Sequence, residues 1–347
     1  SPIRCTQNPS MGEEWRKDWH PERIAPRHRE ARVLVVGGGP AGLEAARALG
    51  QRGYEVSLAE ARREWGGRVT REARLPGLAE WGRVRDWRLG QIRKMPNVAA
   101  YLDSPMAAQD VLEFGAEHVV VATGCHWRRD GYGRSNGLGI AALGGSVTSG
   151  GPAPAGAAAL HPPVFTLDDL MDGRWPEGRV LVFDDDYGYY AGVAAEALRA
   201  KGNAVVFATP DDVVGAWGGY TLEYRHVRKR LAALEVETRV SVNLVEANAS
   251  GVVLEDVWTG RRESVACDAV LLVTARLPED GLFHDLRSRE AEWQGAGIAR
   301  VDRLGDAEAP GMIVHAVYAG HRYAQGLGEG REAEVPFRRH FHQAPVS

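Results

Sequence analysis

Arg32-Val-Leu-Val-Val-Gly37-Gly-Gly39-Pro-Ala-Gly42-Leu-Glu-Ala-Ala46 has the pattern of a buried strand, a glycine turn and a helix start. Gly37 permits the tight turn, Gly39 lets the backbone approach a pyrophosphate, and Gly42 allows the helix to pack closely on the strand. The amino end of the helix supplies free N–H groups and a positive dipole, which favour an anion there. This stretch therefore predicts a dinucleotide-binding turn.

The next predicted strand, Tyr54–Glu60, ends in an acidic residue. In dinucleotide-binding domains an acid about 20 residues beyond the glycine turn accepts a hydrogen bond from a ribose hydroxyl. Glu60 is placed for that role. The alternative is a glycine turn in some other α/β protein, and the presence of strand, helix and acid together argues against it.

Two later segments favour a flavoprotein over a simple dehydrogenase. His118–Gly124 is an apolar strand that ends in the turn Ala-Thr-Gly, and Leu304-Gly-Asp306 precedes a predicted helix over 313–327. In two-dinucleotide reductases the Ala-Thr-Gly turn marks the crossing into the second nucleotide domain. The late Gly-Asp pair places a carboxylate near the ribityl-pyrophosphate region of the cofactor. The order and spacing of these segments carry the inference, because each tripeptide alone is common by chance.

Length and composition fit a two-domain enzyme. The chain has 347 residues, of which 44% are hydrophobic and 25% are charged, enough to bury a large core. A net charge of −4 gives no basic surface for nucleic acid. The sequence has no apolar run of transmembrane length, no signal-peptide pattern and no CxxC pair among its three cysteines. We expect a cytoplasmic enzyme that binds neither nucleic acid nor membrane.

The predicted elements give an arm and two α/β domains. Residues 1–31 lack a period of 2 or 3.6 and are expected to form an extended arm. Residues 32–126 and 276–347 are expected to form an ADP- or FAD-binding domain, and residues 127–275 an NAD(P)-type domain. The predicted fold class is therefore α/β, with two Rossmann-like three-layer nucleotide-binding domains, the second inserted in the first.

Within the second domain the pattern predicts a loop over 139–163 and a helix over 221–234. It also predicts antiparallel strands over 252–257 and 264–274, joined by a turn at Thr259-Gly260.

The second domain lacks the glycine turn that a pyridine-nucleotide domain should repeat. After the predicted strand Arg179–Phe183 the chain has Asp184-Asp-Asp186-Tyr-Gly-Tyr-Tyr190. A carboxylate beside a pyrophosphate costs about 1–4 kcal/mol per close pair at effective dielectric constants of about 80 to 20. The missing glycines add a steric barrier, so NADH or NADPH binding is disfavoured. The alternative interpretation is that Asp184–Asp186 form only a solvated helix cap.

The opening segment carries a family resemblance that extends over almost the whole chain. Cys5-Thr-Gln-Asn-Pro-Ser-Met-Gly-Glu-Glu-Trp-Arg-Lys-Asp-Trp-His-Pro-Glu-Arg23 resembles the segment after the last cluster cysteine in the trimethylamine dehydrogenase family of iron–sulfur flavoproteins. That family is related to 2,4-dienoyl-CoA reductase. Its full-length enzymes have an FMN-bearing TIM barrel, a [4Fe–4S] cluster on four cysteines and two nucleotide-type domains. The resemblance continues through Leu75–Trp81, Ala122–Gly124, Thr221–Tyr224 and Gly305–Pro310.

The resemblance implies that Cys5 is the fourth ligand of the cluster. The three preceding cysteines and the barrel are absent from this sequence, and such a cluster requires four thiolates. We therefore interpret the chain as the C-terminal part of a larger enzyme, or as a processed subunit. Without the resemblance, Cys5 would be read as a small apolar residue in a loop.

The resemblance also bears on the bound nucleotide. In the amine dehydrogenases the first nucleotide domain holds ADP, whereas in the dienoyl-CoA reductases it holds FAD reduced by NADPH. Loss of the second glycine turn favours ADP, and FAD remains the alternative because the Gly-Asp motif is present. The expected nucleotide contacts are Gly37, Gly39, Pro40, Ala41, Gly42, Glu60, Ala61, Arg62, Gly66, Gly67, Arg68, Met106, Thr123, Gly124 and Asp306.

The activity implied by the resemblance is oxidative N-demethylation or amine oxidation at FMN, with electrons passing through the cluster to an electron-transfer flavoprotein. The sequence has no catalytic motif, so catalysis is expected in a part absent from this chain. The expected partners are the barrel portion or subunit, the electron-transfer flavoprotein and further copies in a homo-oligomer. Two alternatives stay open: an FAD-containing reductase module fed by a partner, and a non-catalytic assembly subunit that binds adenine nucleotide.

Overall fold

The computed structural model describes residues 4–14, 19, 24–137, 140, 162–186, 188–248 and 250–328. The chain divides into two compact units. Unit 1 comprises Ser1–Gly67, Val84–Thr123 and Asp280–Ser347, and unit 2 comprises Arg68–Arg83 and Gly124–Glu279. The described part of the predicted arm contains neither helix nor strand, and most of the predicted loop over 139–163 lies outside the described residues.

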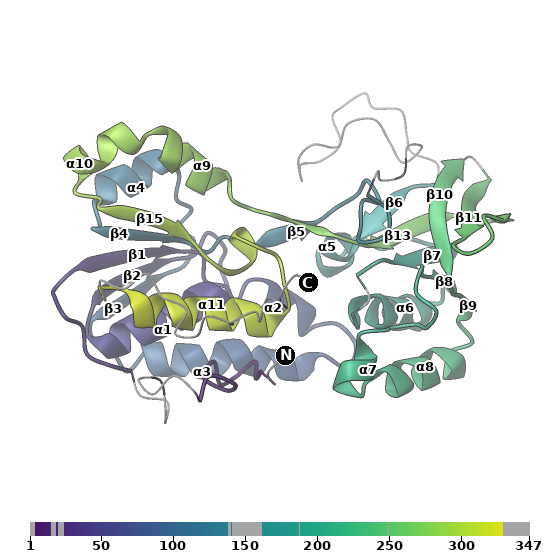
Figure 1. Cartoon of the computed structure of the whole chain (residues 1–347), viewed down its shortest axis with the longest axis horizontal. Helices are drawn as coiled ribbons and strands as arrows, with labels where there is room; N and C mark the ends of the chain where they lie inside the picture. The colour runs from purple at the N-terminus through teal and green to yellow at the C-terminus, as the bar shows by residue number, and fades with distance from the viewer. Residues whose placement is uncertain are drawn as a thin grey trace, which may run out of the picture. The chain divides into compact units, whose positions relative to one another are not determined.

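Unit 1 is built on a five-stranded parallel sheet with strand order β15-β4-β1-β2-β3. The strands are β1 (Arg32–Val36), β2 (Glu55–Ala59), β3 (Val98–Tyr101), β4 (His118–Val121) and β15 (Arg300–Arg303). One face of the sheet is covered by α1 (Pro40–Arg52), α3 (Gly82–Ile92) and α11 (Ile313–Gly326), and the other by α4 (Ala108–Phe114), α9 (Gly281–Ser288) and α10 (Trp293–Ala296) (Figure 1).

Alternating side chains of β1 explain this layering. Val33 and Val35 point into the core beneath α1, whereas Leu34 and Val36 point into the core beneath α4. Because both faces are covered, the strand is an almost continuous apolar run. α11 lies directly against α1: a Cβ at Gly320 would lie only 2.2 Å from the carbonyl oxygen of Ala41.

Unit 2 has its own five-stranded parallel sheet, with strand order β6-β13-β7-β8-β9. One face is covered by helices and the other by a three-stranded antiparallel sheet, with clusters of buried apolar residues on both faces. The parallel strands are β6 (Val164–Thr166), β7 (Arg179–Asp184), β8 (Ala204–Ala208), β9 (Glu237–Arg239) and β13 (Ala269–Val273). The helices of unit 2 are α2 (Arg68–Glu72), α5 (Leu167–Met171), α6 (Tyr190–Ala200), α7 (Gly218–Thr221) and α8 (Tyr224–Ala233), of which α5, α6 and α8 contribute to the buried cluster on the helical face. The antiparallel strands are β10 (Val242–Asn248), β11 (Gly251–Asp256) and β12 (Arg262–Val265), and a separate pair is formed by β5 (Cys125–Trp127) and β14 (Arg276–Pro278).

The predicted α/β fold class with two Rossmann-like units is confirmed, and two element predictions in unit 2 are wrong. The helix predicted over 221–234 is broken, because Leu222 adopts a left-handed φ of 64° between α7 and α8. The strand predicted over 264–274 is two strands: β12 pairs antiparallel with β11, and β13 lies parallel beside β7. A continuous apolar run such as 269–273 is typical of a parallel strand buried on both faces.

The units also differ from the predicted domain limits. Residues 68–83 belong to unit 2, although the sequence placed them in the first domain. The chain returns to unit 1 at Asp280 rather than at residue 276, because β14 pairs with β5 in unit 2. Within the described parts of both units, none of the helices is long and apolar enough to cross a membrane.

Candidate nucleotide-binding site

The glycine turn after β1 contains two glycines that the protein itself requires. Gly37 has a φ of +110°, and a Cβ there would lie 2.3 Å from the carbonyl oxygen of Ala122. A Cβ at Gly42 would lie 1.9 Å from the carbonyl oxygen of Gly37. Both glycines therefore serve the packing of the turn against β4 and α1.

Gly39 differs from these two glycines. It has a φ of −77°, and a Cβ at this position would have no atom of the described chain within 4 Å. In the absence of a ligand, the protein would therefore accommodate a side chain at Gly39. The open space above this residue fits a phosphate group that approaches the backbone closely.

The amino end of α1 complements an anion. Gly39 is the N-cap residue and makes no side-chain capping hydrogen bond, and Pro40 begins the helix. The first turn contains no acidic residue. Its backbone N–H groups have no partner within the helix and carry the positive end of the helix dipole. This end is therefore suited to hold a pyrophosphate.

Glu60 follows β2 directly and is held by the backbone. Its Oε2 accepts a hydrogen bond of 2.7 Å from the N–H of Gly38, and its Oε1 accepts one of 2.8 Å from the N–H of Arg62. The carboxylate is 7% exposed, whereas the side chains of Ala61 and Arg62 are exposed. A carboxylate has further lone pairs, so Glu60 can still accept hydrogen bonds from ribose hydroxyls.

A second glycine pair packs against the turn. The N–H of Gly66 donates to the carbonyl oxygen of Gly38 at 2.8 Å, and a Cβ at Gly67 would lie 3.1 Å from the Cα of Gly39. Trp65, which the sequence analysis missed, covers Gly38, since a Cβ there would lie 2.5 Å from its ring. A tryptophan next to a glycine pair was the available signal for this contact.

The late Gly-Asp motif also lies at this end of α1. Gly305 has a φ of +61°, and a Cβ there would lie 2.7 Å from the Cβ of Ala41. The next residue, Asp306, is 5% exposed, and its Oδ1 accepts a hydrogen bond of 2.9 Å from the N–H of Gly311. The structure therefore brings together residues of the glycine turn, Glu60, Gly66-Gly67 and the Gly-Asp motif.

Four predicted contacts are less closely tied to this group. Thr123 is adjacent to the turn, because its backbone nitrogen would lie 3.1 Å from a Cβ at Gly37. Met106 packs against the apolar cluster on the α4 face. Arg68 and Gly124 belong to unit 2, where Arg68 Nη2 donates to the Tyr190 hydroxyl at 2.7 Å. Contacts of these four residues with a nucleotide stay predictions.

A buried ionic network that the sequence analysis missed fixes α1 in place. Glu44 on α1 accepts hydrogen bonds from Arg88 Nε on α3 at 2.8 Å and from Arg47 Nη2 at 2.5 Å. His321 Nδ1 on α11 lies 2.9 Å from Oε1 of Glu44. Burial alone would raise the pKa of Glu44, but the charges of Arg88 and Arg47 and the hydrogen bond from His321 outweigh it and lower the pKa well below its usual range.

Cys5 lies in the described part of the opening segment. Its Sγ accepts a hydrogen bond of 3.4 Å from the N–H of Gln7. Over the described ranges, no group of three or more His, Cys, Asp or Glu residues is arranged to hold a metal ion. An iron–sulfur cluster of this type requires four thiolates, so the residues of this chain do not fit one by themselves.

The acidic turn of unit 2 is buried and is not a helix cap. Asp184 and Asp185 are each 1% exposed, and the N-cap residue of α6 is Tyr189. The interpretation of Asp184–Asp186 as a solvated cap is therefore wrong. Burial raises the pKa of Asp186 to about 6, although the charge of Arg276, 3.8 Å away, opposes the shift.

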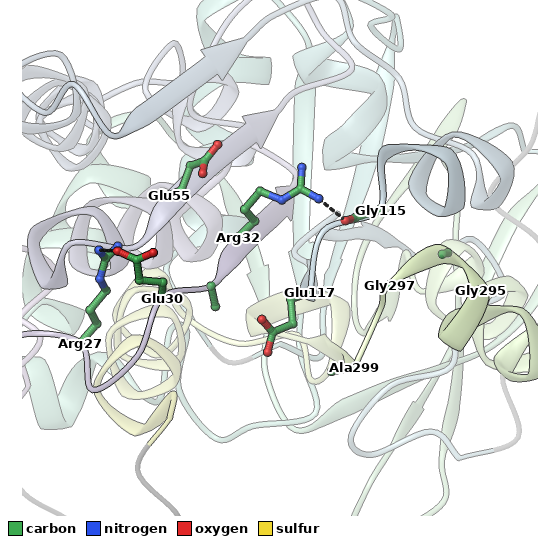
Figure 2. Close-up of a pocket in the computed structure, with 11 residues that line it drawn as sticks. Arg27, Glu30, Arg32, Glu55, Gly115, Glu117, Gly295, Gly297 and Ala299 are labelled. Atoms are coloured by element: carbon green, nitrogen blue, oxygen red, sulfur yellow. Dashed lines mark hydrogen bonds and ion pairs between the residues drawn. The ribbon is translucent and has the colours of Figure 1, made fainter.

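A separate hollow of about 880 Å³ lies at the end of the unit 1 sheet opposite to the glycine turn (Figure 2). Arg32 and Glu55, the first residues of β1 and β2, line it, so it opens at the amino ends of these strands. Arg27 pairs with Glu30 there at 2.9 Å, and Arg32 donates to the carbonyl oxygen of Gly115 at 2.8 Å. None of the glycine-turn residues lines this hollow, so it is distinct from the candidate nucleotide site.

Comparisons with known proteins agree with this description. Residues 35–104 match the model of the NAD(P)-binding Rossmann-like domain. The chain is 35% identical, over an alignment of 363 positions, to dimethylamine dehydrogenase of Hyphomicrobium sp. (strain x), which covers 97% of this chain and 47% of that protein.

Two solved structures are similar over nearly the whole chain. Histamine dehydrogenase from Rhizobium sp. 4-9 has a TM-score of 0.89 and 45% identity, covering 99% of this chain and 48% of that one. The 6-hydroxypseudooxynicotine amine oxidase from Pseudomonas geniculata N1 has a TM-score of 0.85 and 44% identity, covering 94% of this chain and 46% of that one. The chain thus spans about half the length of each of these relatives. On these similarities and on the fold and glycine turn described above, the chain belongs to the trimethylamine dehydrogenase family.

Proposed function

We propose that this chain is the adenine-nucleotide-binding portion of an amine dehydrogenase-like flavoprotein oxidoreductase, and that unit 1 holds ADP. The supporting observation is the space at the amino end of α1. Gly39 faces an opening that no described atom fills, and Glu60 is held beside it by two backbone hydrogen bonds. The pyrophosphate would lie against Gly39 and the first turn of α1, and the ribose against Glu60.

The relatives' names suggest the substrate class. Proteins named for dimethylamine and for histamine are both similar to this chain over at least 97% of its length. We therefore propose that the intact enzyme oxidises an amine, by oxidative N-demethylation or amine oxidation, and that the reacting groups lie outside this chain. FMN would supply the redox chemistry in a barrel portion. Cys5 would supply one of the four thiolates of a [4Fe–4S] cluster, and an electron-transfer flavoprotein would accept the electrons. We place the enzyme in the cytoplasm as a homo-oligomer.

FAD in unit 1 is the second candidate, because one observation favours it. Gly305 touches Ala41 in the first turn of α1, which keeps the Asp306 carboxylate in the neighbourhood where a ribityl chain would pass. ADP is preferred because the acidic turn of unit 2 would deprive such a flavin of a pyridine-nucleotide reductant.

Purification of the native protein from its source tests the proposal. We expect a protein whose flavin absorbance is bleached by an alkylamine, and an isolated chain of residues 1–347 that carries nucleotide without a visible flavin band. A flavin spectrum from the isolated chain would instead support the reductase module. A native protein with nucleotide but without flavin would support the assembly subunit, and either result would refute the proposed function.

A further inference from the structure

The carboxyl edge of the unit 2 sheet is the place where a second dinucleotide would lie. β7 pairs in parallel with β8 in the same way that β1 pairs with β2 in unit 1. In this fold the dinucleotide crosses the carboxyl ends of the two strands. In unit 2, β7 ends at Asp184 and is followed by Asp185 and Asp186, and β8 is followed by Thr209–Asp211.

A segment of the chain itself occupies this edge. The N–H of Ser135 donates a hydrogen bond of 2.8 Å to Oδ2 of Asp185. Arg134 Nη2 lies 2.8 Å from both carboxylate oxygens of Asp211 and 3.8 Å from Oδ1 of Asp185. The approach is close, since a Cβ at Gly133 would lie 2.2 Å from Oδ2 of Asp185.

Ile140, which lies beyond Gly137 in the chain, is anchored in the core. Ile140 is 4% exposed and belongs to the apolar cluster that contains Phe183 and Ala208, the paired residues near the ends of β7 and β8. The N–H of Ile140 donates to the carbonyl oxygen of Asp130 at 2.8 Å, so Ile140 is held beside the first residue of the segment. Asp185 is 1% exposed beneath it.

We propose that the segment Asp130–Gly137, here called the plug, is an internal ligand of the second nucleotide site and excludes NADH and NADPH from unit 2. The Arg134 guanidinium lies against Asp211, where the hydroxyls of an adenosine ribose would be expected, and the Ser135 N–H donates to Oδ2 of Asp185. An anionic dinucleotide would have to displace this cation and face the carboxylates of Asp184, Asp185, Asp186 and Asp211. Exclusion of NADH and NADPH from unit 2 therefore depends on the plug as well as on the missing glycines.

Trypsin can report on this contact, because cleavage of the Arg134–Ser135 bond requires the Arg134 side chain to leave Asp211 and enter the specificity pocket of the protease. Cleavage of the full chain, followed by mass spectrometry, should be slow and unchanged by NADPH. Loss of a hydrogen bond to a charged group weakens the closed state by about 1.5–3 kcal/mol. Asp211→Ala and Arg134→Lys should therefore speed cleavage at this bond by about 10- to 100-fold, since cleavage tracks the open population.

Arg134→Lys keeps the cleavage site and all the carboxylates while removing the planar fork, so its effect separates the contact from the acidic charge. Asp212→Ala is the matched control, because this neighbouring side chain is exposed. It should leave the rate unchanged, and all variants should keep the same unit 1 nucleotide content. Equal cleavage rates for wild type, Asp211→Ala and Arg134→Lys would overturn the proposal. A change in the wild-type rate on addition of NADPH would also overturn it.

Discussion

The carboxylate of Glu44 lies 2.8 Å from Nε of Arg88, and both side chains are 0% exposed. This pair joins α1, which begins at the glycine turn, to α3. Removing one partner of a buried ion pair leaves an uncompensated charge and costs about 3–5 kcal/mol. Arg88→Met should lower the free energy of unfolding of unit 1 by about this amount in urea denaturation. Glu290→Gln, which removes the exposed partner of Arg287, should change it by less than about 1 kcal/mol.

The same pair should make the unfolding free energy of unit 1 depend on pH in the acidic range. The lowered pKa of Glu44 means that the folded state binds its proton more weakly than the unfolded state. Its stabilisation is therefore fully present above the ordinary glutamate pKa of about 4.3 and is lost as the pH falls below it. Glu44→Gln should flatten the fall in unfolding free energy in this range. Parallel curves for wild type and Glu44→Gln would contradict this assignment.

Gly39 and Gly42 should respond differently to replacement by alanine. Gly39→Ala meets no described protein atom within 4 Å, so the protein should fold normally and lose nucleotide affinity by about 1–3 kcal/mol through crowding of the pyrophosphate. Gly42→Ala places a Cβ 1.9 Å from the Gly37 carbonyl oxygen and should destabilise the fold itself. Thermal unfolding of the nucleotide-free proteins, together with calorimetric titration of ADP, separates the two effects. An unaltered ADP affinity in Gly39→Ala would place the phosphates elsewhere.

Glu60→Gln should weaken ADP binding without unfolding the protein. A glutamine side chain has one acceptor oxygen, so it cannot accept from both Gly38 and Arg62 and also from a ribose hydroxyl. Hydrogen bonds to charged groups contribute about 1.5–3 kcal/mol, so the dissociation constant for ADP should rise by about 10- to 100-fold. Glu64→Gln, in the exposed part of the same loop, is the control. Equal affinities of Glu60→Gln and wild type would remove Glu60 from the ribose site.

Asp186 should make unit 2 less stable at higher pH. Burial raises its pKa to about 6, above the ordinary value near 3.9, so the folded state binds the proton more tightly than the unfolded state. The stability of unit 2 should therefore fall as the pH rises through this window and level off above about 6. Asp186→Asn, which does not titrate, should exceed wild type by about 2–3 kcal/mol in unfolding free energy at about pH 8. If Asp186→Asn is less stable than wild type at that pH, the ion pair with Arg276 outweighs burial.

Local sequence patterns predicted the parts of the fold that depend on local chemistry. The strand, the turn and the helix of residues 32–46 follow from apolar runs and glycine positions, and Glu60 follows from its place at the end of the next strand. The split of 264–274 into β12 and β13 was missed, because an apolar run does not reveal which sheet it joins.

Long-range polar contacts were not predictable in this way. The sequence contains nothing local that pairs Glu44 with Arg88, or Asp185 with Ser135, because these contacts form only when distant elements pack together. Burial of the acidic turn was missed for the same reason. Acidic residues are usually exposed, and the contact between Ser135 and Asp185 that accompanies burial here joins residues far apart in the sequence.

Identification of the nucleotide that the protein carries tests whether an ADP moiety lies against the first turn of α1. The purified chain should be denatured and its released small molecules analysed by chromatography and mass spectrometry. We expect one ADP per chain, and loss of that ADP from Gly39→Ala. Release of FAD or of a pyridine nucleotide, or the absence of any adenine nucleotide, would contradict it.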